Sequence, residues 1–252
     1  MELIVIGAGP AYTDRRGAAA SSYLVRAGEA ALLLELGQGA FPNLASTLEP
    51  SELAAVVVSH LHPDHFIDLV PLRHYLRFEF DPPRRVRVMG PVGLGDRLDA
   101  LHAQAGFAAA SLDVGPLAAL QRVGPFEVEA RLVHHTEESY AFRVSIAGAA
   151  GAPSGPGLVY SGDCGRADDL VPLIRPGDTL LSEASFGAGP VPAGAEHLTA
   201  ADAGRAATAG QAARLLLTHI QMGYSRADAL AVGQAAFAGP IQIVTEGDRF
   251  EV

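Results

Sequence analysis

The sequence predicts an α+β fold in which mixed sheets are covered by helices. Two observations carry this prediction. Short apolar runs rich in Val, Ile and Leu follow one another closely near the start of the chain, and in its last third such runs alternate with helical patterns. A chain of 252 residues, 49% of them hydrophobic, can also build a sizeable core. We expect residues 1–252 to form a single domain.

The first half of the chain begins with apolar runs separated by glycines. They predict strands at residues 3–6, 22–26, 31–36 and 54–59. A helical pattern starts at Asp64, where apolar residues recur at spacings of two to four between Ile67 and Tyr75. Pro63 lies at the start of this helix, where a backbone N–H would have no partner within the helix, so its absence in proline costs little. Pro82 follows the end of the helix. A strand at residues 86–89 and an Ala-rich helix at residues 95–105 come next.

The second half contains a predicted hairpin followed by alternating strands and helices. Residues 126–132 alternate between apolar and charged side chains, and residues 139–146 form the hairpin partner. A Gly/Pro-rich loop at residues 147–157 is the expected hairpin tip. Strands are then predicted at residues 158–161, 179–182, 214–218 and 241–245, and helices at residues 199–212 and 226–237. Thr199 and Asp202 form a capping box at the start of the first of these helices.

The composition excludes several classes of protein. The chain has no Lys, so all 18 basic residues are Arg. Without an amine it cannot carry a P-loop lysine, a pyridoxal Schiff base, a Ser–Lys hydrolase pair or a kinase lysine. The single Cys164 excludes a disulfide framework, a Cys-based zinc finger and an iron–sulfur cluster. The nine His are therefore the side chains in which to look for chemistry.

Charge and hydropathy indicate the surroundings that the chain suits. The first ten residues contain a Glu and no basic residue, unlike a signal peptide, and no apolar run approaches the roughly 20 residues of a membrane span. We therefore expect a soluble, cytoplasmic protein that does not enter membranes. A net charge of −10 argues against a partner as large as an extended nucleic acid. The oligomeric state stays open, with a homodimer as one expectation.

Residues 4–11 (IVIGAGPA) share the pattern that begins a dinucleotide-binding βαβ unit. In that unit, glycines such as Gly7 and Gly9 let the backbone approach a pyrophosphate at a helix N-terminus. Here Tyr12 stands where a third small residue is needed, and a polar loop follows where a helix is required. A dinucleotide-binding protein built on these two glycines is the alternative from a different class. A strand followed by a Gly-rich turn is the simpler interpretation.

Four metal-competent side chains lie within six residues directly after a predicted strand, in the string His60-Leu61-His62-Pro63-Asp64-His65. His60 and His62 are two residues apart, so an extended segment projects both in the same direction. Asp64 and His65 follow the bend and can face a second ion nearby. Imidazole and carboxylate ligands suit Zn²⁺, with Mn²⁺ or Fe²⁺ as alternatives. The competing interpretation, a His-rich surface loop, is disfavoured because the string is long and specific.

This string is similar to that of the metallo-β-lactamase superfamily of dinuclear metallohydrolases, and the resemblance extends over nearly the whole chain. It implies a four-layer αββα sandwich with further ligands on loops that follow strands. The third His has two candidates. Continuing the alternation of the strand at residues 126–132 places His134 on its apolar face, which suits a residue that faces the core or supports a ligand. The family pattern V-x-H-T instead selects His135. A Y-S-G-D turn places a bridging carboxylate at Asp163, and His219 ends a later strand.

The resemblance also divides these residues between two divalent ions. It implies a first site of His60, His62 and His135, a second of Asp64, His65 and His219, and Asp163 shared by both. A water or hydroxide between the two ions would be the nucleophile. The unpaired Cys164 then lies beside the site, where an inert small residue is the favoured interpretation over a ligand.

Two further strings resemble ribonuclease Z and its phosphodiesterase relatives. Residues 181–186 (LSEASF) are similar to their H-E-A-T/S-F segment, with Ser182 in place of the His, and residues 196–200 (EHLTA) to their H-x-T-A helix start. The resemblance implies that Glu183 and His197 act together near the scissile phosphate, where the His contacts the phosphate or protonates the leaving oxygen. We expect Asp64, Glu183 and His197 to be the catalytic residues.

The substrate expected from these patterns is a small phosphodiester such as a cyclic nucleotide. The short interval between His135 and Asp163 leaves no room for the long tRNA-gripping arm of bacterial ribonuclease Z, and the chain has no Lys to hold a polyanion. Ribonuclease Z-like RNA processing, or hydrolysis of a lactone, thioester or lactam, are the alternatives within the superfamily. The lactone, thioester and lactam hydrolases share the metal ligands, but they give less reason for the Glu183–His197 pair.

The remaining singled-out residues have structural interpretations. By the same resemblance, Glu35 matches a family position behind the metal site that is usually an Asp, where it would support a ligand. His74 and His102 lie on predicted helices as surface or packing residues. The cluster of Arg84, Arg85 and Arg87 is expected to be a solvated strand start, with contact to an anionic substrate as the alternative.

Overall fold

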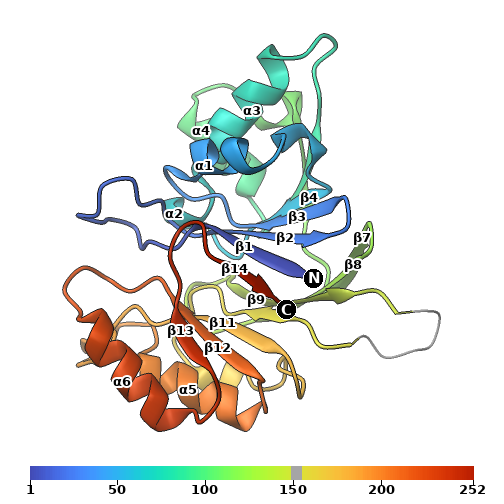
Figure 1. The fold of residues 1–252 in the computed structure, drawn as a ribbon. Coiled ribbons are helices and arrows are strands. Elements are labelled where there is room, and N and C mark those ends of the chain that lie inside the picture. Colours follow the sequence, from blue (N-terminus) through green and yellow to red (C-terminus); the bar gives the residue numbers. More distant parts are fainter. Residues whose placement is uncertain (149–154) are drawn as a thin grey trace.

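The computed structural model describes residues 1–148 and 155–252. Two seven-stranded sheets lie face to face, and helices cover the outer face of each (Figure 1). This is the predicted four-layer αββα sandwich. Over the described ranges, none of the helices has the length and apolarity needed to cross a membrane.

The first sheet combines antiparallel and parallel strands, and its outer face carries the helices of the first half of the chain (Figure 1). In spatial order its strands are β14 (Arg249–Glu251), β1 (Glu2–Gly7), β2 (Ser22–Ala27), β3 (Ala30–Leu34), β4 (Ala55–Val57), β5 (Val86–Gly90) and β6 (Leu112–Pro116). The helices are α1 (Ala40–Thr47), α2 (Pro63–Phe66), α3 (Leu69–Phe78) and α4 (Leu94–Leu101), with 3₁₀ turns at Pro50–Glu52 and Ala108–Ala110.

The second sheet is antiparallel at one side and parallel at the other. In spatial order its strands are β13 (Ile241–Ile243), β12 (Arg214–Thr218), β11 (Thr179–Glu183), β10 (Leu158–Tyr160), β9 (Tyr140–Ile146), β8 (Phe126–Leu132) and β7 (Leu120–Val123). Helices α5 (Ala200–Ala209) and α6 (Arg226–Ala236) cover its outer face, and a 3₁₀ turn lies at Ala167–Asp169. The predicted capping box is confirmed, since Thr199 and Asp202 cap α5 reciprocally.

The layers are held by three apolar clusters, one between the sheets and one under each helical layer. Strand β1 shows how the sequence supports two of them. Its Leu3 and Val5 face the second sheet, while Ile4 and Ile6 face the helices of the first half. A central strand buried on both faces therefore needs a continuous apolar run.

The helix expected from Asp64 onward is broken in two. The backbone N–H of Asp68 donates to Leu36 O at 3.1 Å, and its carboxylate accepts the N–H of Phe41 at 2.9 Å. These tertiary bonds interrupt the helix after α2, and α3 begins at the next residue. The helix expected at residues 95–105 ends at Leu101. Part of the predicted hairpin tip, residues 149–154, lies outside the described residues.

The sequence analysis did not predict four of the helices and strands that the structure contains, namely α1, β6, β7 and β14. They are short and lack a clear periodic signal. The dinucleotide-binding alternative is wrong, because residues 8–21, all of them described, form a loop without a helix. Gly9 instead bridges to Ala20, and a Cβ on Gly7 would lie 1.9 Å from the carbonyl oxygen of that residue. Because these glycines lack a Cβ, the start of the loop can pack closely against its last residues.

Candidate metal centre

The predicted ligands meet at one edge of the two sheets. The histidine string follows β4 in the first sheet, whereas His135, Asp163 and His219 follow β8, β10 and β12 of the second sheet. Strands β10, β11 and β12 are parallel, so their carboxyl ends reach the same edge. Positive φ at Gly162 (57°) and His219 (58°) turns the chain sharply after β10 and β12. The site is therefore assembled from segments far apart in the sequence.

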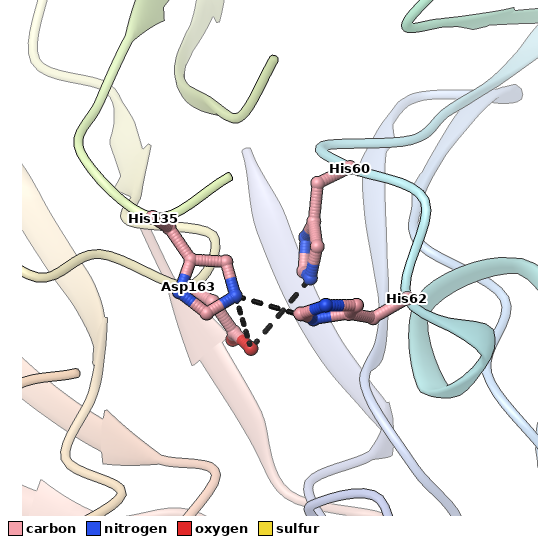
Figure 2. A group of neighbouring side chains, drawn as sticks. All are labelled: His60, His62, His135 and Asp163. Atoms are coloured by element: carbon pink, nitrogen blue, oxygen red, sulfur yellow. Dashed lines mark hydrogen bonds and ion pairs between the residues drawn. The ribbon is translucent and has the colours of Figure 1, made fainter. Parts of the chain in front are cut away.

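A first cluster joins His60, His62, His135 and Asp163, whose nearest ligand atoms all lie within 4.8 Å of one another. Figure 2 shows the three imidazoles converging on the carboxylate. Asp163 Oδ2 is 3.7 Å from His60 Nε2 and 3.8 Å from His135 Nε2, and His135 Nε2 is 3.2 Å from His62 Nδ1. Three nitrogens and one oxygen in this arrangement can enclose one divalent ion.

A second cluster lies on the other side of the same carboxylate and contains Asp64, His65 and His219. Asp64 Oδ2 is 3.2 Å from His219 Nε2 and 3.6 Å from His65 Nε2. The other oxygen of Asp163, Oδ1, is 3.4 Å from His65 Nε2 and 3.7 Å from His219 Nε2. Asp163 therefore presents one oxygen to each cluster, the arrangement expected of a carboxylate that bridges two ions.

Unpaired buried atoms show that this donor set fits metal ions. His60 Nε2, His65 Nε2 and Asp163 Oδ1 are buried without a hydrogen-bond partner. Burial lowers the pKa of His60 well below its usual value. Burial alone would raise the pKa of Asp163, but the nearby imidazoles of His219 and His65 hold it well below its usual range. Burial would lower the pKa of His65 and of His219, but the carboxylates beside them, Asp163 first, raise both. A divalent ion requires neutral imidazole facing an ionised carboxylate, so an ion bound at the second cluster would take the place of protons on these two rings.

The structure brings His135, and not His134, into the first cluster. His135 Nδ1 donates to the carbonyl of Glu196 at 2.8 Å, which leaves Nε2 facing Asp163. The His134 side chain is 44% exposed and pairs with the Glu196 carboxylate at 3.1 Å. His135 therefore reaches the cluster while His134 stays exposed, and the choice made from the family pattern agrees with this geometry.

Glu183 and His197 lie beside the two clusters. His197 Nδ1 is 2.9 Å from Glu183 Oε1 and 3.9 Å from Asp163 Oδ2. The buried Glu183 carboxylate also accepts the backbone N–H groups of Cys164 (2.9 Å) and Ser185 (3.0 Å). Burial alone would lower the pKa of His197, but its bond with Glu183 outweighs burial and raises the pKa to about 9. The pair thus supplies an imidazolium at the edge of the cluster.

Buried polar side chains behind the ligands orient their rings. Glu35 accepts the backbone N–H of Ser59 at 3.0 Å and lies 3.7 Å from His65 Nδ1, as expected for a residue that supports a ligand. The hydroxyl of Ser185 lies 3.0 Å from His219 Nδ1 and donates to Glu183 Oε2 at 2.6 Å. The sequence reasoning assigned no role to Ser185, although its place in the string Glu-Ala-Ser was the available signal.

The other singled-out residues lie outside the clusters. His74 and His102 pack around Phe107 in the first helical layer, with their own ring centroids 5.5 Å apart. Arg84 and Arg85 bond to Ser51 and Asp113 on the protein surface. These contacts agree with the structural interpretations expected for them.

A cavity of about 270 Å³ opens onto the metal centre. It is lined by five residues of the site and by the loop after β1: His62, Asp64, Asp163, His197, His219, Pro10, Ala11 and Tyr12, with Pro63 and Gln221. The imidazolium and the ligand atoms therefore face one common space in which a substrate can bind.

Comparison with known proteins identifies the family. Residues 30–220 match the model of the beta-lactamase superfamily domain. An uncharacterized protein of Mycobacterium leprae, ML1173, is 34% identical over 243 residues, which cover 92% of this chain and 82% of that protein. A ribonuclease Z of Salinispora arenicola is 28% identical over 295 residues, covering 97% and 94% of the two chains. The metallo-β-lactamase-fold protein YhfI from Bacillus subtilis shares the fold, with a TM-score of 0.85 at 24% identity over 99% of both chains. With this fold and ligand geometry, the chain belongs to the metallo-β-lactamase superfamily.

Proposed function

We propose that this chain is a two-metal hydrolase that cleaves a small phosphodiester such as a cyclic nucleotide. The observation that carries the proposal is the Glu183–His197 pair, held 2.9 Å apart at the edge of the ligand clusters. Hydrolysis of a phosphodiester expels an alkoxide, which needs a proton, and side chains that hold metal ions are deprotonated and cannot supply it. The pair supplies that donor beside the place where the phosphate would bind.

The geometry gives His197 and Glu183 separate roles. Glu183 occupies Nδ1 of His197, so Nε2 is the ring nitrogen without a hydrogen-bond partner among the described residues. With a pKa of about 9, the ring is protonated at neutral pH and can donate from Nε2 to the leaving oxygen. Glu183 is a positioning residue, since its carboxylate fixes the ring and stabilises the positive charge.

The two clusters are proposed to hold two Zn²⁺ ions, with Mn²⁺ or Fe²⁺ as alternatives. When bound, such ions lower the pKa of a water molecule toward neutrality and offset the negative charge of the phosphate. His60, His62 and His135 would hold one ion, Asp64, His65 and His219 the other, and Asp163 both. The orphaned imidazole and carboxylate atoms support this assignment.

A small substrate is favoured over a long nucleic acid. The cavity that includes His197 measures about 270 Å³, just below the usual range of ~300–1,000 Å³ for small-molecule sites. The net charge of −10 also opposes association with a polyanion. Ribonuclease Z-like RNA processing is the second candidate, favoured by the similarity to a protein with that name. Hydrolysis of a lactone, thioester or lactam is the third.

The test couples metal analysis to a panel of substrates. We expect about two metal ions per chain and turnover of bis(p-nitrophenyl) phosphate and cyclic AMP, with little on lactones or a tRNA precursor. Turnover should collapse in Asp64→Ala and His62→Ala proteins that remain folded. On cyclic AMP, His197→Ala should retain both metals and lose about 10²–10⁴-fold in kcat, because the leaving alkoxide loses its proton donor. Turnover of bis(p-nitrophenyl) phosphate should fall far less, because p-nitrophenolate leaves without a proton.

His102→Ala provides the matched control, since this exposed imidazole lies outside both ligand clusters. Unchanged turnover in both folded ligand variants would refute the metal mechanism. Cyclic AMP hydrolysis that survives His197→Ala, or a panel in which only the lactone or only the tRNA precursor is cleaved, would refute the proposed substrate.

A further inference from the structure

A second cavity adjoins the metal centre at His62. It measures about 520 Å³, within the range of small-molecule sites. Its lining residues are Leu61, His62, Pro91, Val92, Arg97, Thr136, Glu137 and Glu138. His62 also lines the smaller cavity, so the two spaces meet at a proposed metal ligand. The second cavity therefore lies next to the place where a phosphate would bind at the metal centre.

The walls of this cavity come from both sheets. Pro91 and Val92 follow β5 of the first sheet and Arg97 lies on α4, whereas residues 136–138 belong to the loop between β8 and β9. One hydrogen bond joins the walls, because the N–H of Val92 donates to Glu138 Oε2 at 3.0 Å. The hydroxyl of Tyr140 donates to the other oxygen of Glu138 at 2.8 Å. The fold therefore places this cavity at the same edge of the two sheets as the metal centre.

The lining combines three kinds of surface. Leu61 is partly buried and Val92 is 75% exposed, and both line the cavity, so apolar area is open to it. The side chains of Arg97 and Glu137 are exposed at the cavity and have no hydrogen-bond or ion-pair partner among the described residues. A guanidinium and a carboxylate that bind nothing within the protein are available to a ligand.

We propose that this cavity binds the nucleobase of the substrate and that Glu137 selects a base with an exocyclic amino group. The proposal rests on the proposed phosphodiesterase function, which places a phosphate at the metals. Apolar side chains suit the face of a planar ring, and a guanidinium stacks on it. The carboxylate of Glu137 accepts a hydrogen bond from an amino group, as carboxylates do in base recognition.

The charges of the lining favour a base over a second anionic group. Two carboxylates, Glu137 and Glu138, face one guanidinium, Arg97, so an additional phosphate would meet net repulsion. An adenine presents an amino group at the position where hypoxanthine presents a carbonyl oxygen. The carbonyl would face the carboxylate without a proton between them, so Glu137 favours adenine over hypoxanthine.

The experiment measures binding of AMP and IMP to the zinc-loaded protein by isothermal titration calorimetry. We expect the wild-type protein to bind AMP about tenfold more tightly than IMP, the ratio given by one hydrogen bond to a charged acceptor. Glu137→Gln should bring this ratio close to one, because an amide can accept from adenine and donate to hypoxanthine. Arg97→Ala should weaken both nucleotides about tenfold, through lost stacking, and leave the ratio unchanged.

Glu79→Gln and Arg87→Ala are the matched controls, since both residues are exposed and line neither cavity. Thermal unfolding checks that each variant folds, with Glu137→Ala and Arg97→Gln as second variants. Equal binding of AMP and IMP by the wild-type protein, or wild-type binding by both cavity variants, would overturn the proposal. So would weakened AMP binding in Tyr12→Ala alone, which would place the base in the smaller cavity.

The two proposals fail separately. If the protein cleaves phosphodiesters while Glu137→Gln and Arg97→Ala bind both nucleotides as the wild type does, the proposed function stands and the base site is refuted. If it cleaves no phosphodiester but shows the expected nucleotide ratios, the base site stands and the proposed function is refuted.

Discussion

Glu35 and His219 are non-glycine residues next to the ligand clusters that hold left-handed backbone conformations, with φ of 62° and 58°. Such conformations are strained for residues with a Cβ and persist only where the surroundings hold them. The N–H of Glu35 donates to Val57 O at 2.9 Å, and that of His219 donates to Ala8 O at 3.1 Å. Both residues lie directly after strands, so the strain coincides with the turns that direct their side chains at the site.

Cys164 illustrates a residue whose place beside the site does not make it reactive. It is fully buried, and burial raises the pKa of its thiol to about 12. Because the thiolate is the nucleophile, we expect native protein at pH 8 to react with Ellman's reagent at least about 100-fold more slowly than protein unfolded in guanidinium. The absorbance of the released thiolate measures both rates. Rapid labelling of the native protein would contradict this expectation.

At the scale of elements, the metal centre depends on how the turn after β3 packs against α2. Leu36 N–H donates to the carbonyl of His65 at 2.9 Å, so this turn supports the helix that carries two of the ligands. Gly37 lies at the closest approach, where a Cβ would be 1.9 Å from the carbonyl oxygen of Asp64. The contact joins segments that only the folded sheet brings together.

Replacing this glycine should disturb both stability and metal binding. Gly37→Ala forces the turn away from α2, and we expect a loss of about 1–3 kcal/mol in the free energy of unfolding together with weaker metal binding. Denaturant unfolding and competition with a chelator measure the two effects. Gly115→Ala is the control, since a Cβ there meets no atom within 4 Å. Equal behaviour of the two variants would contradict the role assigned to the contact.

At the scale of the whole molecule, the candidate ligands come from both halves of the sandwich. His60, His62, Asp64 and His65 follow a strand of the first sheet, while His135, Asp163 and His219 belong to the second. Bound ions would therefore link the two sheets at this edge, in addition to the apolar cluster between them. Metal binding would therefore be coupled to global stability.

Metal removal should lower the melting temperature. An ion present at about 100 times its Kd stabilises the folded state by about 2.7 kcal/mol, so dialysis against a chelator should reduce Tm by several degrees, and added Zn²⁺ should restore it. Differential scanning calorimetry with metal analysis of the same samples tests this. A Tm that stays constant while the metal content falls to zero would show that the clusters do not link the sheets energetically.

Sequence reasoning reached most of the fold because the local signals were strong. The alternating run at residues 126–132 and the capping box at Thr199 depend on neighbours in the chain, and both occur in the structure. The break between α2 and α3 could not be predicted, because it arises when the N–H of Asp68 bonds to Leu36 instead of within the helix. Short edge strands such as β7 and β14 likewise owe their existence to a neighbouring strand.

The sequence by itself determined the chemical identity of the candidate site, since side-chain types and their spacing in the string from His60 to His65 are properties of the chain. Only the tertiary structure decided which side chains share one space. Backbone turns decide whether His134 or His135 faces Asp163, and packing of two sheets decides that Arg97 and Glu137 line one cavity with His62. Distances between segments remote in sequence depend on the whole fold, so no local pattern encodes them.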